Sequence, residues 1–315
     1  MLMHVLTPLS RPDAHPFRVL ISAILALICS WSPLLAEIAP DSPYARKTAY
    51  FGGLSRQLFG GDRNDITIAT EMFFKEIVNR IGHHDTVKFK VYESKSEILR
   101  AMRHDKLDTI FANPIDYLDL DPQINPNFRY TLTYGPVPEQ RVYLITYAED
   151  KILGLEDLRS KRLSIPSGYI LGMTYLEVLL GRDDLPAPRR FFSSVASTNS
   201  SNAAILDVVF QKADLAVTSD VAFRLATELN PQINGLIDIL DVSDPFIPFI
   251  IGVNKQVPRD FTDSVDEILS DIGHQPRLRR ILAMFSATDV VKVSDQQLEN
   301  LKALKQEHER LRGNH

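Results

Sequence analysis

The chain has 315 residues, of which 44% are hydrophobic and 24% are charged, and its formal net charge is −5. These proportions are typical of a soluble globular protein, and the length suffices for two modest domains or one large one. The acidic balance argues against nucleic acid as a partner, because binding a phosphate backbone requires a basic surface.

The first 36 residues have the order of a secretory signal peptide. Arg11 and Arg18 precede a mainly apolar run at 19–28, and the small residue Ala36 stands just before the polar sequence begins. This order of positive, apolar and small residues predicts export to the periplasm with cleavage after Ala36. The alternative is an inner-membrane anchor formed by residues 19–36, although the apolar run is shorter than the roughly 20 residues that span a bilayer.

Beyond a polar lead-in at 37–62, short β-branched runs alternate with amphipathic stretches. The runs predict strands, and apolar residues at the spacing of one helix face predict helices between them. The predicted strands lie at 66–70, 87–91, 107–112, 130–134 and 141–147, with helices at 72–81 and 96–104. Such an alternation is typical of an α/β fold.

The second half of the chain has a similar plan. A short helix and strand at 155–165 and a helix ending at 180 begin a new unit, and the apolar run 245–253 returns the chain to its first lobe. A strand at 191–192, a polar loop at 193–202, a helix at 203–210 and a strand at 213–218 have the same order as residues 87–112. Helices at 260–272 and 276–285 complete the first lobe. We therefore expect lobe 1 at 63–145 and 246–315, and lobe 2 at 146–245.

The end of the chain, from Ser294, is predicted to be a helix. Leu298, Leu301, Leu304 and Leu311 lie near one face of it, among many charged residues. We expect this helix to pack on its own lobe. The alternative is a helix that binds a partner or a second copy of the chain, although four leucines are too few to indicate a coiled coil.

Five short motifs follow one another along the chain. They are a helix-to-strand turn at 102–108, Asn-Pro-Ile-Asp-Tyr at 113–117, Leu-Glu-Asp-Leu-Arg-Ser-Lys-Arg at 155–162, a helix leading into Ala-Asp-Leu-Ala at 203–216, and Ser-Asp-Pro-Phe-Ile-Pro at 243–248. Their order resembles that of the phosphate- and phosphonate-type substrate-binding proteins of ABC transporters. The resemblance covers roughly residues 63 to 305 and rests on the order of the motifs rather than on any one of them.

The resemblance implies a type 2 periplasmic binding protein fold. That fold has two α/β lobes, each a mixed sheet flanked by helices, joined by two crossing strands and closing on a ligand between them. The implied function is the capture of a small anionic or polar solute for an ABC permease by a monomer, without a cofactor and without catalysis. The alternative is a ligand-sensing or degenerate two-lobed domain that signals to a membrane partner such as a histidine kinase.

Ligand contacts are expected in the loops that follow the strands, because ligands of open α/β sheets bind outside the carboxyl ends of the strands. Helix N-termini there offer unpaired N–H groups to an anion, and hydroxyl and amide side chains complete the cradle. For Ser200, Ser201 and Asn202 the alternative is that they only cap a helix. The candidate residues are Thr70, Glu71, Asn113, Ser167, Tyr169, Thr198, Ser200, Ser201, Asn202, Thr218, Ser219 and Asp220.

The chain departs from the family pattern at three places. The family's Ser-Thr-Ser-Gly run is shortened to the stretch 167–172, and Ser201 stands where the family tends to have histidine. Ile250 stands where members that bind amino-bearing phosphonates have a carboxylate. A zwitterionic aminophosphonate is therefore not the expected ligand.

Other motifs do not indicate chemistry. His83, His84 and Asp85 form a short polar cluster, but adjacent histidines point in different directions and no further ligands follow at metal-site spacing. A solvated loop is the simpler interpretation. The sequence contains no Gly-x-Ser-x-Gly, Walker or dinucleotide-binding glycine pattern, so we expect neither a metal site nor an enzyme.

Overall fold

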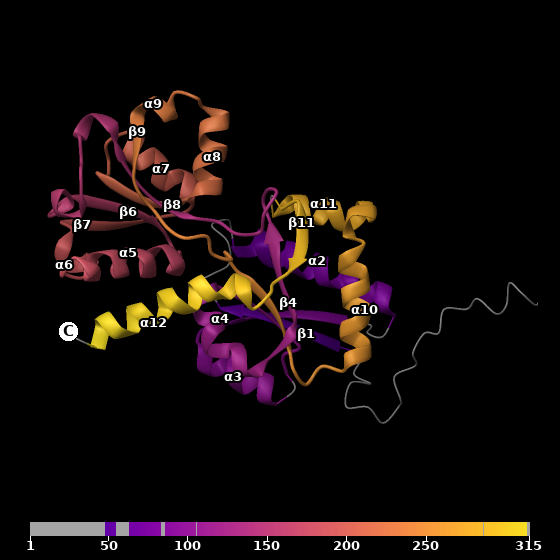
Figure 1. The fold of residues 1–315 in the computed structure, drawn as a ribbon. Helices are drawn as coiled ribbons and strands as arrows, with labels where there is room; N and C mark the ends of the chain where they lie inside the picture. The colour runs from indigo at the N-terminus through magenta and orange to yellow at the C-terminus, as the bar shows by residue number, and fades with distance from the viewer. Residues whose placement is uncertain (1–47, 55–62, 83–85, 105, 286, 314–315) are drawn as a thin grey trace, which may run out of the picture. The chain divides into compact units, whose positions relative to one another are not determined.

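The computed structural model describes residues 48–54, 63–82, 86–104, 106–285 and 287–313 (Figure 1). The predicted signal peptide at 1–36 and the cluster at 83–85 lie outside these ranges. None of the described helices combines the length and the apolar character that crossing a membrane requires.

Lobe 1 is built on a mixed sheet of six strands in the order β11-β4-β10-β3-β1-β2. Strand β1 pairs in parallel with both β2 and β3, whereas β10 runs antiparallel to both β3 and β4. The strands are β1 (Thr48–Leu54), β2 (Thr86–Tyr92), β3 (Thr109–Ala112), β4 (Ile124–Thr133), β10 (Ile250–Asn254) and β11 (Asp289–Lys292).

Helices cover both faces of this sheet. One apolar cluster joins one face of the sheet to α2, α10 and α11, and another joins the opposite face to α3 and α4. In the first cluster, the rings of Phe51 in β1 and Phe74 in α2 stack with centroids 3.9 Å apart. The helices are α2 (Arg63–Ile81), α3 (Lys95–Arg103), α4 (Pro114–Leu120), α10 (Arg259–Ser270) and α11 (Pro276–Met284).

The prediction of a strand at 66–70 is wrong, because these residues belong to α2. Thr70, Phe73, Phe74, Ile77 and Val78 are all buried, which is the helical spacing of one face, whereas Ile68 is 53% exposed. Burial at the helical period outweighs the β-branched composition of the segment. The strand that fills the predicted place in the sheet is β1, within the stretch 37–62 that was expected to be a lead-in.

Lobe 2 is built on a mixed sheet of five strands in the order β7-β6-β8-β5-β9. Strand β6 is parallel to β7 and β8, and β5 is antiparallel to β8 and β9. Helix α5 packs on one face, and α7, α8 and α9 pack on the other. The elements are β5 (Val142–Tyr147), β6 (Arg162–Pro166), α5 (Ile170–Arg182), α6 (Pro188–Phe191), β7 (Ser194–Thr198), α7 (Ser201–Val209), β8 (Leu215–Ser219), α8 (Asp220–Leu229), α9 (Ile233–Leu236) and β9 (Ile237–Val242).

The strand predicted at 191–192 is displaced in the structure. Phe191 ends the short helix α6, and the strand is β7, inside the run 193–202 that was predicted to be a loop. Since β7 is an edge strand with mainly exposed side chains, it carries no apolar pattern. The two buried phenylalanines instead pack edge to face with centroids 5.0 Å apart.

Two segments connect the sheets, and the expected lobe boundary between residues 145 and 146 falls inside β5, which pairs with β8 and β9 of lobe 2. The chain passes from β4 to β5 through 134–141 and from β9 to β10 through 243–249. Gln140 and Phe246 exchange two backbone hydrogen bonds, each 2.8 Å long. Arg141 Nη1 also donates to the Ser243 carbonyl oxygen at 2.6 Å, so the two connections are held to each other.

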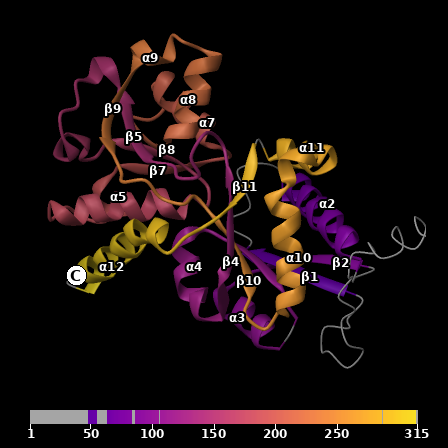
Figure 2. The ribbon, with the colours of Figure 1, turned by 45° about the vertical axis from the view of Figure 1, so that its right-hand side comes forward.

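The C-terminal helix α12 (Glu299–Gly313) runs along α5 of lobe 2, as Figures 1 and 2 both show. Arg182 of α5 makes a two-pronged ion pair with Glu307 at 3.0 and 2.6 Å, and His308 Nε2 lies 2.5 Å from Glu177 Oε2. A smaller contact joins α12 to α4 of lobe 1, where Lys305 pairs with Asp119. The expectation that this helix packs on its own lobe is therefore wrong for most of its length.

The contacts of α12 also explain its leucines. Leu298, Leu301 and Leu304 are buried in the apolar cluster that includes α4 and α5, and Leu311 packs against it. An added Cβ at Gly181 would lie 2.9 Å from Leu311 Cδ1, so the glycine lets the two helices approach closely. The leucine face is thus occupied within the chain.

Short 3-10 turns complete the described secondary structure. They lie at Asp121–Gln123, Ala148–Asp150, Leu155–Leu158, Ile272–His274 and Gln296–Leu298. The last of these begins the approach to α12, with Asp295 Oδ1 accepting a hydrogen bond from Arg129 Nη2 at 2.8 Å. Arg129 lies in β4, so this ion pair fixes the end of the chain to the lobe 1 sheet.

Candidate ligand-binding site

The parallel strands of lobe 2 end at one edge of the sheet. Pro166 at the end of β6 is paired with Thr198 at the end of β7, and the Ser167 N–H donates to the Thr198 carbonyl oxygen at 2.8 Å. Strand β8, parallel to β6 on its other side, ends at Ser219. Each of these strands leads into a helix, so the N-termini of α5, α7 and α8 lie at this edge. We call it the lobe 2 edge.

Serine side chains cap α7 and α8. Ser200 Oγ accepts a hydrogen bond from the Ala203 N–H at 3.1 Å, and Ser219 Oγ accepts from the Ala222 N–H at 3.2 Å. The sequence left open which residue of 200–202 caps the helix, and the structure assigns that role to Ser200. Each cap satisfies one of the free N–H groups of the first turn and leaves others to a ligand or to water.

Several candidate side chains on this edge remain available. The half-buried Ser201 and the exposed Asn202 lie in the first turn of α7, and their side chains form no hydrogen bond within the described part of the chain. Ser167 is also exposed, whereas Thr198 Oγ1 donates to the Ser200 carbonyl oxygen at 3.0 Å. The edge therefore offers hydroxyl and amide groups without a fixed positive charge from these residues.

Tyr169 begins α5 without a capping bond from its side chain. Its ring lies against Gly172, where an added Cβ would come within 2.4 Å of Tyr169 Cε1. Burial raises the pKa of the Tyr169 phenol, and the nearby Asp220 carboxylate raises it further, so the phenol is a neutral hydrogen-bond donor at physiological pH. Asp220 itself accepts a hydrogen bond at Oδ1 from the Val221 N–H at 2.8 Å.

Thr218 is fully buried, and the other residues of β8 are buried as well. Its Oγ1 has no hydrogen-bond partner among the described residues. A buried hydroxyl without a partner destabilises the fold by about 1 to 3 kcal/mol, so it is usually explained by strain, an ordered water or a functional role. Thr218 stands directly before the cap of α8, at the lobe 2 edge.

Of the candidate ligand-binding residues predicted in lobe 1, one lies after a strand and two do not. Asn113 follows β3 and caps α4, since its Oδ1 accepts from the Asp116 N–H at 2.9 Å. Thr70 and Glu71 lie inside α2 rather than after a strand, and Thr70 Oγ1 is buried without a partner among the described residues. The structure therefore does not bring Thr70 and Glu71 to the carboxyl edge of the sheet as predicted.

One helix cap at the carboxyl edge of lobe 1 was not among the residues predicted from the sequence. Ser94 follows β2 and caps α3, with its Oγ accepting from the Glu97 N–H at 3.3 Å. The signal was present, because Ser94 and Glu97 have the spacing of a capping box. Since β2 and β3 both run parallel to β1, the caps Ser94 and Asn113 belong to the same edge of the sheet.

The apolar return segment is part of the core. Phe249, Ile250 and Ile251 are all buried, and Ile250 pairs with Ala112 across β10 and β3. Tyr117 of the Asn-Pro-Ile-Asp-Tyr motif is likewise fully buried, as expected for a core aromatic. Within the described ranges, no group of three or more His, Cys, Asp or Glu side chains is arranged to hold a metal ion.

Comparison with protein families gives a match over most of the chain. Residues 62–298 match the family described as "ABC transporter, phosphonate, periplasmic substrate-binding protein". No curated protein matched the chain.

Solved structures share the fold. A binding protein component of an ABC phosphonate transporter from Pseudomonas aeruginosa has a TM-score of 0.61 at 17% identity, covering 84% of this chain and 87% of its own. PhnD1 from Prochlorococcus marinus, solved in complex with methylphosphonate, has a TM-score of 0.61 at 14% identity, covering 84% of this chain and 99% of its own. A Xanthomonas citri protein solved with chloride ion has a TM-score of 0.60 at 14% identity, covering 85% of this chain and 100% of its own. At these identities the likeness confirms the two-lobed α/β fold that the sequence predicted.

The unpaired hydroxyl of Thr218 leads to a stability prediction. Thr218→Val replaces that hydroxyl with a methyl group, and we expect the free energy of unfolding of the ligand-free protein to rise by about 1 kcal/mol. Urea denaturation measures it. The matched control is Thr133→Val, whose hydroxyl lies 2.9 Å from Thr288 Oγ1 and whose loss should lower stability by about 1 kcal/mol. If the free energy of unfolding fell equally in both variants, the Thr218 hydroxyl could not be unpaired in the folded protein.

Proposed function

Because the chain belongs to the family of periplasmic substrate-binding proteins of phosphonate ABC transporters, we propose that it captures a small anionic or polar solute between its lobes for delivery to an ABC permease. The observation that carries this proposal is the meeting of the N-termini of α5, α7 and α8 at the lobe 2 edge. Helix N-termini attract anions through free N–H groups and through the positive end of the helix dipole.

Recognition at this edge would depend on neutral donors. The side chains of Ser201 and Asn202 and the protonated phenol of Tyr169 can donate hydrogen bonds, together with free N–H groups of the first helical turns. Thr218 would gain a partner if the ligand or an ordered water reached its hydroxyl. Such a site binds and releases its ligand unchanged, which agrees with a family of binding proteins rather than enzymes.

The departures from the family pattern bear on the ligand. Ser201 offers a neutral hydroxyl where the family tends to have an imidazole, and Ile250 is buried in β10 where a carboxylate would be needed for a ligand ammonium. The acid at the lobe 2 edge is Asp220, and its Oδ1 already accepts the Val221 N–H. We therefore propose a ligand whose far end is neutral or apolar.

We also propose that the chain reaches the periplasm through cleavage of residues 1–36. The family is periplasmic, and the order of Arg11, Arg18 and the apolar run 19–28 supports a signal peptide. The intact mass of protein from a periplasmic extract should correspond to a chain that begins at Glu37. Recovery of the chain from the membrane fraction with residues 1–36 attached would indicate an anchored receptor instead.

The roles of Ser201 and Asn202 can be separated from capping, because Ser200 is the residue that caps α7. We expect Ser201→Ala combined with Asn202→Ala to weaken binding of methylphosphonate, used as a probe, by about tenfold. The free energy of unfolding should change by less than about 1 kcal/mol. Calorimetric titration and urea denaturation measure the two quantities.

The control for this experiment is Ser194→Ala. Ser194 is exposed at the opposite end of β7, so its loss should leave both affinity and stability unchanged. Unchanged affinity in the Ser201 and Asn202 variant, together with a lower stability, would leave these residues with a structural role alone. Absence of binding in the unmodified chain for phosphonates, phosphate, sulfonates and carboxylates alike would contradict the transport proposal.

The proposed ligand chemistry predicts a preference between two phosphonates. Propylphosphonate should bind at least as tightly as 2-aminoethylphosphonate, because a desolvated ammonium without a counter-charge costs several kcal/mol, a large share of the about 8 kcal/mol of micromolar binding. Parallel calorimetric titrations test the preference. Micromolar binding of the amino compound with the propyl compound about tenfold weaker would show that a carboxylate, with Asp220 the first candidate, pairs with the ammonium.

A further inference from the structure

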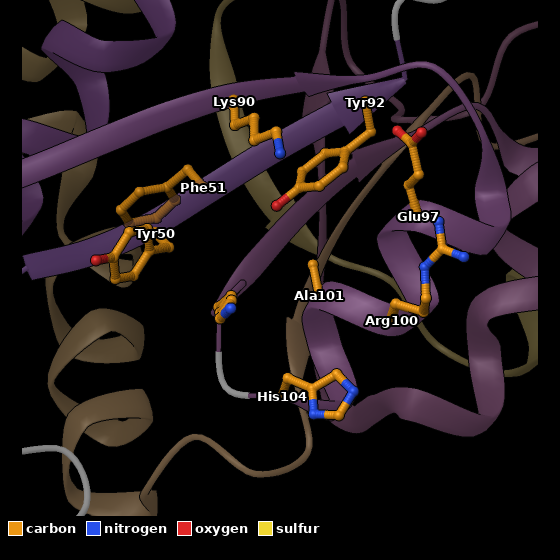
Figure 3. Close-up of a pocket in the computed structure, with 9 residues that line it drawn as sticks. Tyr50, Phe51, Lys90, Tyr92, Glu97, Arg100, Ala101 and His104 are labelled. Carbon is orange, nitrogen blue, oxygen red and sulfur yellow. The ribbon is translucent and has the colours of Figure 1, made fainter.

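A cavity of about 460 Å³ lies in lobe 1, on the face of the sheet that α3 covers. Its walls come from β1, the edge strand β2, the helix α3, and the residues His104 and Lys106 (Figure 3). The volume falls within the range typical of small-molecule sites. None of the candidate residues of the lobe 2 edge lines it. Its polar and aromatic lining residues are Tyr50, Phe51, Lys90, Tyr92, Glu97, Arg100, His104 and Lys106.

Positive charge gathers around this cavity although the whole chain is acidic. Lys90, Arg100 and Lys106 are exposed at its rim, and no carboxylate lies within ion-pair distance of any of them in the part of the chain that the structure describes. Other cations of the two lobes have such partners, for example Lys95 with Asp116 at 3.1 Å and Arg162 with Asp214 at 2.8 Å. The rim therefore has a local excess of positive charge, which raises the local concentration of anions.

The acid that lines the cavity does not neutralise these cations. Glu97 Oε2 accepts a hydrogen bond from the Glu93 N–H at 3.2 Å, at the start of α3. Arg100 follows Glu97 on α3 and His104 caps the end of that helix, as Figure 3 shows. One carboxylate against three Lys and Arg side chains leaves the lining cationic.

The wall of the cavity is aromatic and well fixed. Tyr92 is only 4% exposed, and an added Cβ at Gly52 would lie 2.5 Å from its Cε2, so the absence of a side chain at Gly52 lets the Tyr92 ring lie close over β1. Lys90 Nζ stands 4.8 Å from the centroid of the same ring, which holds the ammonium beside it. Burial raises the pKa of the Tyr92 phenol, with a further contribution from Glu97, so the phenol stays neutral and can donate.

An aromatic wall with cations at its rim fits one class of ligand. The ring surface favours an apolar or planar body, while guanidinium and ammonium groups favour phosphate or carboxylate. We propose that this cavity is a second ligand site, which binds a small organic anion through Lys90, Arg100 and Lys106. It is independent of the proposed transport function, because it shares no residue with the lobe 2 edge.

The test uses phenyl phosphate as the probe and the full chain in calorimetric titrations at low ionic strength. Lys90→Gln combined with Arg100→Gln should weaken its binding at this site by about tenfold or more. The matched control is Lys88→Gln combined with Arg103→Gln. It removes the same charge from the same strand and helix, at exposed residues outside the cavity lining, and should change affinity by less than about twofold.

A further arm separates this site from the lobe 2 edge. The chain that carries Ser201→Ala and Asn202→Ala should still bind phenyl phosphate, and that binding should be lost when Lys90→Gln and Arg100→Gln are added. Equal affinity of the Lys90 and Arg100 variant and its control would overturn the proposal. Binding to vesicles of anionic phospholipid without binding to phenyl phosphate or inorganic phosphate would also overturn it, since the occupant would then be a membrane surface.

Discussion

Parallel pairing of β6 with both β7 and β8 is the constraint on which lobe 2 depends. A strand that runs parallel to its neighbour cannot turn back directly, so the chain must cross the sheet between them, here through α5, α6 and α7. Each strand then ends at the same edge and a helix starts there. That edge has free N–H groups and the caps Ser200 and Ser219, whatever ligand the protein binds. The polar character of the lobe 2 edge thus follows from the direction of its strands and not only from its side chains.

Lobe 1 has two places whose chemistry suits an anion, and they differ in kind. At the carboxyl edge of its parallel strands, Ser94 and Asn113 cap helices with neutral side chains, as in lobe 2. On the face covered by α3, the cations stand in a cavity that the sheet itself floors, with Tyr92 lying over Gly52. The first arrangement relies on backbone dipoles, which are fixed and uncharged, whereas the second relies on full charges and is more strongly screened by salt.

The parts of the fold that the sequence predicts well are those with local signals. Strand β6 is followed by the Ser167-Gly168 turn, β8 follows directly on Ala213-Asp214, and the segment around Phe246 is bounded by prolines, so these three segments were predicted from the sequence. The errors arise where tertiary burial decides: the β-branched segment 66–70 lies in α2, where Thr70 is buried and Ile68 is exposed, and the exposed edge strand β7 has no apolar pattern. Thr70 and Glu71 were misplaced as a direct result. The cavity beside Tyr92 could not be predicted from the sequence either, because its lining residues come from separate elements that only the folded chain brings together.

The path of the chain after β11 has a consequence for anyone who labels this protein. Strand β11 belongs to the lobe 1 sheet, yet the helix α12 that follows it lies on α5. Arg182 forms an ion pair with Glu307 there, and Gly181 lies beside Leu311. A fluorophore attached to the end of α12 would therefore report on lobe 2, not on the lobe that holds β11. Its partner in an energy-transfer pair belongs on lobe 1, for instance at the exposed end of α10. A pair chosen from chain order alone would place both dyes on lobe 2 and would not report the distance between the lobes.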